Sequence, residues 1–181
     1  MAPKRILSRL IVAIASATFA AALLSGMTSH HAVAAEAVTK ADTYGDWTLY
    51  ADAKSPHLFC FVTSEPKSSE PADTAREQPR VYISAWPKDG VKGEVSFRLG
   101  FPAKKNSEVT ASVAPAGFKL FASDDRAYVQ DATQELKMLE AMKKGAKVTV
   151  SASTQTGVAV TDSYSLSGLG QAMGQLQSTC F

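Results

Sequence analysis

Apolar and polar side chains alternate with a period of two along most of the chain after residue 46. The clearest case is 94–99, where polar residues separate Val95, Phe97 and Leu99. This alternation is typical of strands that have one face in a core and the other in solvent. It predicts eight or nine short strands, within 47–50, 58–62, 81–86, 94–99, 109–113, 118–122, 127–129, 147–151 and 158–166.

Turn-forming residues punctuate these segments, at 87–90, 102–106, 115–117 and 123–125. Many short strands separated by such turns favour a mainly β fold, either a sandwich or a barrel. The segment 58–62 is apolar on both of its faces, which predicts a central strand that is covered on both sides.

Residues 65–79 interrupt the strand pattern. They contain three prolines, several charges and no apolar side chain larger than alanine. Such a segment buries too little surface to offset the entropy of ordering it. We therefore predict a long, exposed, flexible loop at 65–79, within a single domain that spans 36–181.

Two segments have the period of helices. The first is short and internal; Asp131 is placed to cap it, and Gly145 is placed to end it. Its apolar stripe consists of Leu136, Leu139 and Met142. The second closes the chain, and one of its faces carries Leu169, Ala172, Met173, Leu176 and Cys180. Its last cysteine is therefore expected to point toward the core.

The first 35 residues have the order of a cleaved secretory signal peptide. Basic residues at 4–9 precede an apolar run from Leu10 to Leu24, and small residues follow at 32–35. The run is shorter than the ~20 residues that a membrane-spanning helix needs. We expect cleavage after Ala34 or Ala35 and a soluble mature chain with no stable membrane span; a retained anchor is the alternative.

Loss of the signal peptide changes the net charge. The chain has 19 basic and 17 acidic residues, and the first 35 residues hold three of the basic ones and none of the acidic ones. The mature chain would therefore carry 16 basic and 17 acidic residues. A nearly neutral domain has no general attraction to phosphate backbones, so we expect no nucleic-acid binding.

Cys60 and Cys180 are the two cysteines, and both follow the predicted cleavage site. In an oxidising compartment a disulfide between them is the natural pairing, with two free thiols or bridges between chains as alternatives. Because Cys60 lies in the most apolar predicted strand, the bridge would tie the final helix to the sheet. For a loop of about 120 residues, chain entropy alone predicts a stabilisation of up to ~5 kcal/mol.

Candidate catalytic chemistry is sparse. The predicted mature chain has one histidine, His57, which follows a proline in an expected turn, where a lone histidine is most often a surface residue. One histidine and two cysteines are too few for the usual zinc ligand sets. The acidic pairs at 124–125 and at Glu135 and Glu140 lie in a turn and on a solvent-facing helix side. We expect no enzyme activity, no metal and no cofactor.

Tyr82 and Trp86 alternate with the apolar positions of the strand 81–86, so both point away from the core. Either these rings form an exposed aromatic patch suited to a partner, or a loop or helix covers them. We take Tyr82 and Trp86 as the possible partner-binding surface.

Several short motifs, in this order and spacing, resemble the invasion-associated locus B family of alphaproteobacterial exported proteins. They include Tyr44-Gly45-Asp46-Trp47, Cys60-Phe61, Ile83-Ser84-x-Trp86-Pro87, Gly100-x-Pro102, Thr161-Asp162-x-Tyr164 and the final helix with Cys180. The resemblance covers nearly all of the predicted mature chain. Some members carry a further cysteine shortly after the tryptophan, but here Trp47 is followed by Thr-Leu-Tyr. A second bridge is therefore not expected.

The resemblance implies an immunoglobulin-like β-sandwich in the periplasm, at the outer membrane or outside the cell. It also implies an association with host-cell invasion in pathogenic members, and no established enzymatic activity. Our leading hypothesis is a non-enzymatic binding or adhesion and invasion-accessory module, with an envelope or host-surface protein as its partner. The alternative is a periplasmic housekeeping or inhibitor protein, whose loop at 65–79 would insert into a partner.

Overall fold

The computed structural model describes residues 38–52 and 54–181. The predicted signal peptide at 1–35 lies outside the described residues. Within the described part of the chain, neither α-helix combines the length and the apolar character that a crossing of the bilayer demands.

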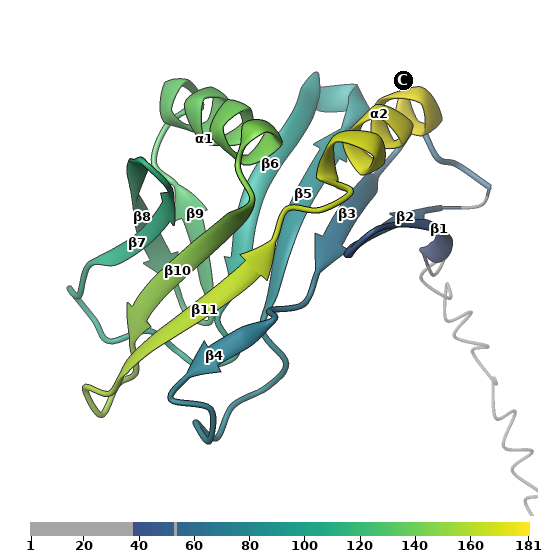
Figure 1. Cartoon of the computed structure of the whole chain (residues 1–181). Helices are drawn as coiled ribbons and strands as arrows, with labels where there is room; N and C mark the ends of the chain where they lie inside the picture. Colours follow the sequence, from purple (N-terminus) through teal and green to yellow (C-terminus); the bar gives the residue numbers. More distant parts are fainter. Residues whose placement is uncertain (1–37, 53) are drawn as a thin grey trace, which may run out of the picture. The chain divides into compact units, whose positions relative to one another are not determined.

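The described residues form eleven strands, two α-helices and one short 3₁₀ helix (Figure 1). The strands are β1 (Thr39–Tyr44), β2 (Trp47–Ala51), β3 (Cys60–Ser64), β4 (Ser68–Glu70), β5 (Arg80–Trp86), β6 (Val91–Arg98), β7 (Val109–Val113), β8 (Ala116–Ser123), β9 (Arg126–Val129), β10 (Lys147–Ser153) and β11 (Ala159–Ser165). The helices are η1 (Pro87–Asp89), α1 (Ala132–Lys144) and α2 (Leu169–Cys180). The predicted mainly β fold with an internal and a C-terminal helix is confirmed.

All eleven strands belong to one antiparallel sheet, in the order β1-β2-β3-β5-β6-β9-β8-β7-β10-β11-β4. The sheet bends, so that β10 and β11 lie across the core from β5 and β6 (Figure 1). The rings of Phe97 on β6 and Tyr164 on β11 show this closeness, with centroids 6.0 Å apart. The two layers expected of a sandwich are thus two halves of one hydrogen-bonded sheet, which continues from β6 into β9.

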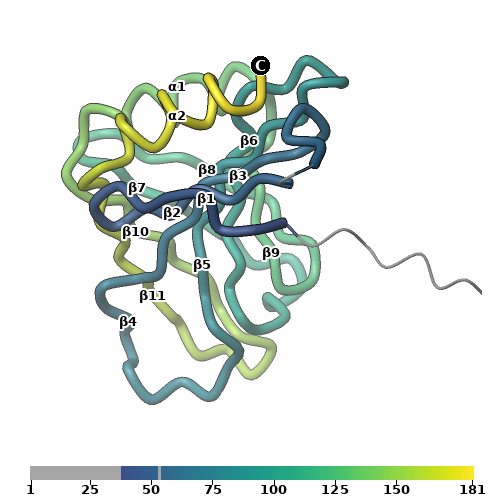
Figure 2. Tube along the Cα trace, turned by 90° about the vertical axis from the view of Figure 1, so that its right-hand side faces the viewer, coloured from purple at the N-terminus to yellow at the C-terminus, as the bar shows by residue number. Residues whose placement is uncertain are grey.

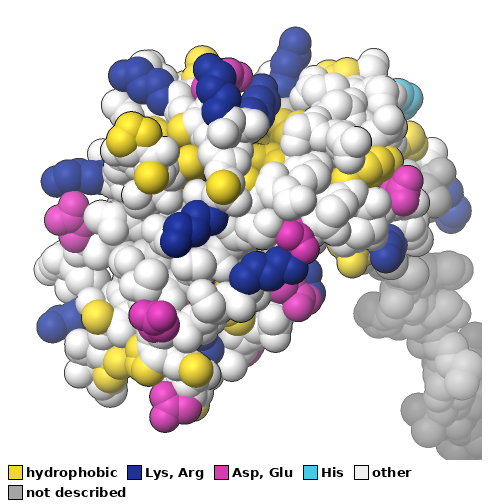
Figure 3. Space-filling model, in the orientation of Figure 1, with side chains coloured by type: hydrophobic (Ala, Val, Ile, Leu, Met, Phe, Trp, Pro, Cys, Tyr) yellow, Lys and Arg dark blue, Asp and Glu magenta, His cyan; other side chains and the backbone are white. Residues whose placement is uncertain are grey.

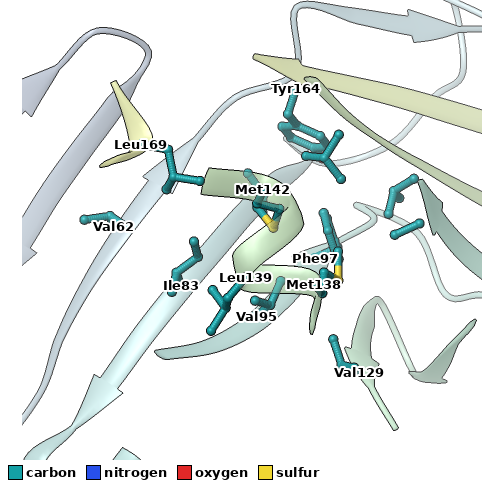
Figure 4. Close-up of a cluster of buried hydrophobic side chains, with 14 of the residues drawn as sticks. Val62, Ile83, Val95, Phe97, Val129, Met138, Leu139, Met142, Tyr164 and Leu169 are labelled. Atoms are coloured by element: carbon teal, nitrogen blue, oxygen red, sulfur yellow. The ribbon is translucent and has the colours of Figure 1, made fainter. Parts of the chain in front are cut away.

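Helix α1 forms because its first turn is capped and one of its faces is apolar. The side chain of Asp131 accepts a hydrogen bond from the backbone N–H of Gln134 at 2.9 Å, as the sequence predicts. Met138 and Met142 are fully buried between the strands of the core (Figure 4). The predicted stripe residue Leu136 differs, because it is 66% exposed, and Met138 takes its place in the core.

Helix α2 packs the predicted apolar face onto the sheet, and its five members are all buried. Cys180, in its last turn, forms a disulfide with Cys60, the first residue of β3. The two Cα atoms are 6.3 Å apart and 120 residues apart in sequence. The predicted tie between the final helix and the sheet is therefore confirmed.

Two polar segments are more ordered than the sequence indicates. Thr39–Tyr44 forms β1 although its side chains are mostly exposed, because its backbone pairs with β2. Within 65–79, Ser68–Glu70 forms β4 and pairs with β11, and the Arg76 side chain is only 6% exposed. The expectation of one irregular exposed loop is wrong for these residues; the flexibility of the remainder stays a prediction.

Gly168, which precedes α2, touches the turn between β1 and β2. It has a φ of +87°, and a Cβ added there would lie 2.0 Å from the carbonyl oxygen of Tyr44. We expect Gly168→Ala to lower the free energy of unfolding by about 2 kcal/mol or more. The added methyl group would force the backbone at Gly168 or at Tyr44 to move, and either movement is unfavourable.

Chemical denaturation checks this expectation, with Gly117→Ala as the matched control. A Cβ on Gly117 meets nothing within 4 Å, so this variant should stay within about 1 kcal/mol of the parent. Equal unfolding midpoints for the two variants would contradict the prediction.

Candidate binding surface

The outward face of the sheet carries a group of aromatic side chains where β2, β3 and β5 lie side by side. In the register of these strands, Tyr50 lies opposite Phe61, and Phe61 lies opposite Ser84. These positions alternate with the inward, buried residues of the same strands. We define the aromatic face as Tyr50, Phe59, Phe61, Tyr82 and Trp86.

The five rings form one connected cluster. Phe61 lies at the centre, with ring centroids at 5.1 Å from Tyr50, 5.4 Å from Phe59 and 5.7 Å from Tyr82. Phe59 stacks in turn on Trp86, at 4.1 Å. Contacts of this kind contribute about 0.5–1.5 kcal/mol each beyond simple burial, so the rings hold one another in place. The aromatic face is therefore a preordered surface.

Small residues beneath the rings allow this arrangement. Ser84 on β5 and Ser96 on β6 point to the same side of the sheet as the rings, yet are only 7% and 4% exposed. Trp86, in contrast, is 37% exposed, and Phe59 and Phe61 are half-buried. The rings thus shield the sheet while keeping part of their own apolar surface in solvent.

The two residues predicted as a partner-binding surface, Tyr82 and Trp86, both belong to the aromatic face. The structure joins them through Phe59 and Phe61 rather than by direct contact. The sequence prediction missed those two phenylalanines and Tyr50. The sequence signal for these outward rings was the segment 58–62, which is apolar on both faces. We interpreted it as a strand covered on both sides. In the structure its outer side is covered only in part, by neighbouring rings.

A row of three arginines borders the aromatic face. Arg80, Arg98 and Arg126 are direct cross-strand neighbours on β5, β6 and β9. The guanidinium of Arg126 lies over the ring of Tyr82, 5.4 Å from its centroid. Like charges that face each other across strands are unfavourable, and acidic residues offset this repulsion. These acidic partners are Glu65 for Arg80, and Glu77 and Asp125 for Arg98.

A second pair of rings lies on the same outward face, on the neighbouring strands β8 and β9. Phe121 on β8 stacks on Tyr128 on β9 at 5.4 Å, and Phe121 is 46% exposed. Tyr128 lies opposite Ser96, which itself lies opposite Tyr82. Aromatic rings and arginines therefore share one sheet face across several strands. Protein interfaces favour this side-chain composition.

The single histidine of the described residues lies elsewhere. His57 is exposed, and its Nδ1 is 3.0 Å from the carbonyl oxygen of Cys180. Within 38–52 and 54–181, no three histidine, cysteine, aspartate or glutamate side chains are grouped to hold a metal ion.

Comparison with known proteins gives one match. The family model for invasion associated locus B (IalB) proteins matches residues 47–177, a range that includes the whole aromatic face. No curated protein and no solved structure matches the chain.

Proposed function

The chain belongs to the invasion-associated locus B family, and from this premise we propose that it is an exported, non-enzymatic binding module whose partner docks on the aromatic face. The observation that carries the proposal is the contiguous cluster of five partly exposed rings, bordered by arginines. Aromatic and arginine side chains are the usual anchors of protein interfaces. Contiguous exposed apolar patches rimmed by polar residues are a feature of interaction sites.

The proposed compartment is the periplasm, the outer membrane surface or the cell exterior. The signal-like residues 1–35 support export. The disulfide between Cys60 and Cys180 supports an oxidising compartment, because such bridges are rare in the reducing cytosol. In this setting the partner would be a protein of the envelope or of a host surface. The chain would then have an accessory role in adhesion or invasion.

Binding of the purified exported protein to host-cell surfaces and to isolated envelope fractions tests the proposal. We expect the double variant Phe59→Ala, Trp86→Ala to bind about ten-fold more weakly or worse, since truncation of central aromatic anchors has effects of this size. Val158→Ala is the matched control, because Val158 is 44% exposed but lies outside the aromatic face.

Circular dichroism must show that the double variant keeps its fold. Unchanged binding by a folded double variant would refute the aromatic face as the docking site. Failure of the parent protein to bind any of these surfaces would refute the proposed function itself.

A second candidate function is envelope housekeeping or inhibition of another protein. It is favoured by the turn at 71–75, which is mostly exposed and is held between β4 and the buried Arg76. A short segment fixed at both ends is preorganised to enter a partner. Replacing only 71–75 with glycine and serine should abolish partner capture and leave the unfolding temperature nearly unchanged; capture that persists would argue against this function.

A further inference from the structure

The two helices enclose an apolar groove that is separate from the aromatic face. Figures 1 and 2 agree in placing α1 and α2 next to each other at the same end of the domain. The groove between them has a volume of about 710 Å³, and residues 90–93 form its floor. Figure 3 shows hydrophobic side chains gathered between the helices, with positively charged side chains around them.

The walls of this inter-helix groove are apolar; Leu136 is exposed, whereas Leu139 and Met173 are each only 8% exposed. Leu136 and Leu139 of α1 line one wall, and Met173 of α2 lines the other. Leu136 is 66% exposed, the largest exposure among the large hydrophobic residues that the structure describes. Its apolar surface at the rim would be removed from water if a partner covered it.

Two glycines in α2 also face the groove. Gly170 and Gly174 line it, and a Cβ added to either would meet nothing within 4 Å. Glycine is unfavourable inside a helix, and packing within the described chain does not require it here. Gly145 is different, because a Cβ there would lie 2.5 Å from Val113. Two glycines about one turn apart leave the backbone uncovered on an open helix face, and this allows another helix to approach closely.

The charges on the rim of the groove are mainly positive. Lys92 and Lys143 line it, and Lys143 also pairs with Glu140 at 3.0 Å. The one acidic lining residue, Glu135, turns inward and accepts a hydrogen bond from the backbone N–H of Val95 at 2.7 Å. Burial raises the pKa of this carboxyl. An occupant with acidic flanks therefore complements the rim.

The floor of the groove is not suited to backbone pairing with a further strand. Side chains of the two helices already bond backbone groups of β6: Glu135 accepts from Val95, and the Nε2 of Gln177 donates to the carbonyl oxygen of Lys92 at 2.8 Å. An occupant must therefore pack on side chains rather than pair with the strand. Among the ways in which peptides are recognised, an amphipathic helix laid in an apolar groove fits this geometry.

We propose that the inter-helix groove binds an acidic amphipathic helix of a partner protein. Its apolar side chains would cover Leu136 and contact the small exposed parts of Leu139 and Met173, and its backbone would approach Gly170 and Gly174. Its carboxylates would lie near Lys92 and Lys143. This site goes beyond the proposed function, and it does not depend on the aromatic face.

A synthetic peptide pair tests the charge and the shape of the occupant. One helical peptide of about 18 residues, or five turns, carries leucines on one face and glutamates on the other; its twin carries lysines in place of the glutamates. We expect the acidic peptide to bind about ten-fold more tightly or better, and to perturb NMR signals at 90–93, in α1 and in α2. Equal affinities, or perturbation elsewhere, would overturn the proposal.

Gly174→Leu separates binding from folding. A Cβ at this position meets nothing within 4 Å, and leucine favours the helix over glycine, so we expect the unfolding temperature not to fall. Acidic-peptide affinity should fall about ten-fold or more, since the leucine fills the groove. The control is Gln175→Leu, which places the same side chain on the next residue, outside the groove. Equal affinity of the two variants would refute the site.

Two further measurements address other occupants. Lys92→Glu with Lys143→Glu should reverse the preference toward the basic peptide, and a retained acidic preference would contradict the electrostatic argument. Sedimentation should show that the parent protein forms no dimer through the inter-helix groove. A dimer through the groove would be recognised because Gly174→Leu would abolish it. Such a dimer would identify a second copy of the chain as the occupant and overturn the proposal. Variants of the aromatic face should leave peptide binding unchanged.

Discussion

Replacing Asp162 with asparagine is expected to lower the free energy of unfolding by about 3–5 kcal/mol, the usual effect of leaving a buried charge without its partner. The Asp162 and Arg76 side chains are only 2% and 6% exposed. The Arg76 guanidinium donates to both carboxylate oxygens, and also to the carbonyl oxygen of Leu99 at 2.9 Å. Ser69 donates to the same carboxylate at 2.7 Å. These bonds fasten segment 65–79 to β11.

Chemical denaturation monitored by tryptophan fluorescence measures this loss. Glu108→Gln is the control, because Glu108 pairs with Lys119 at 3.4 Å on an exposed surface, where a pair contributes at most about 1 kcal/mol. Arg76→Met combined with Asp162→Leu should recover part of the stability, since neither charge is then buried alone. An Asp162→Asn protein as stable as the parent would show that the pair is not needed for the fold.

Replacing both Cys60 and Cys180 with alanine is expected to cost about 2–5 kcal/mol of unfolding free energy. The bridge joins residues 120 apart, so its removal frees the unfolded chain from a very long loop. The end of α2 should then open locally before the rest of the domain, because Gly170 and Gly174 weaken the helix itself.

Hydrogen exchange of the amides at 169–180 and denaturant unfolding check the two parts of this prediction. Reduction of the parent protein with dithiothreitol should reproduce the effect of the double variant. The same reagent should leave the double variant unchanged, which controls for other effects of the reductant. Protection at 169–180 that survives loss of the bridge would show that apolar packing alone holds the helix.

Much of the fold was predictable because its signals are local in the sequence. Alternation locates the strands with a buried face, as in Val95 and Phe97, both fully buried. The capping position of Asp131 and the apolar face that ends in Cys180 predict α1 and α2 and the orientation of the last cysteine. Each of these features depends on residues within one element, so neighbouring positions suffice to predict it.

The remainder depends on contacts between residues distant in sequence. Strand β4 is polar and forms because β11 offers its backbone, and Arg76 is buried because Asp162, 86 residues further along, neutralises it. Only two residues of the aromatic face, Tyr82 and Trp86, were predicted, for the same reason. Tyr50 and Phe61 meet through the pairing of β2 with β3, and nothing in either segment alone indicates the contact.

The first and last strands of the sheet, β1 and β4, differ from the others in a way that bears on how partners approach. β1 is irregular, with a register shift between Lys40 and Asp42, and β4 has three residues and is followed directly by Pro71. Charged, kinked and short outermost strands are the devices by which β proteins avoid growing into aggregates at their sheet margins. Both margins of the sheet therefore disfavour pairing with a further strand, so the broad sides of the domain are the surfaces on which the proposed partners would dock.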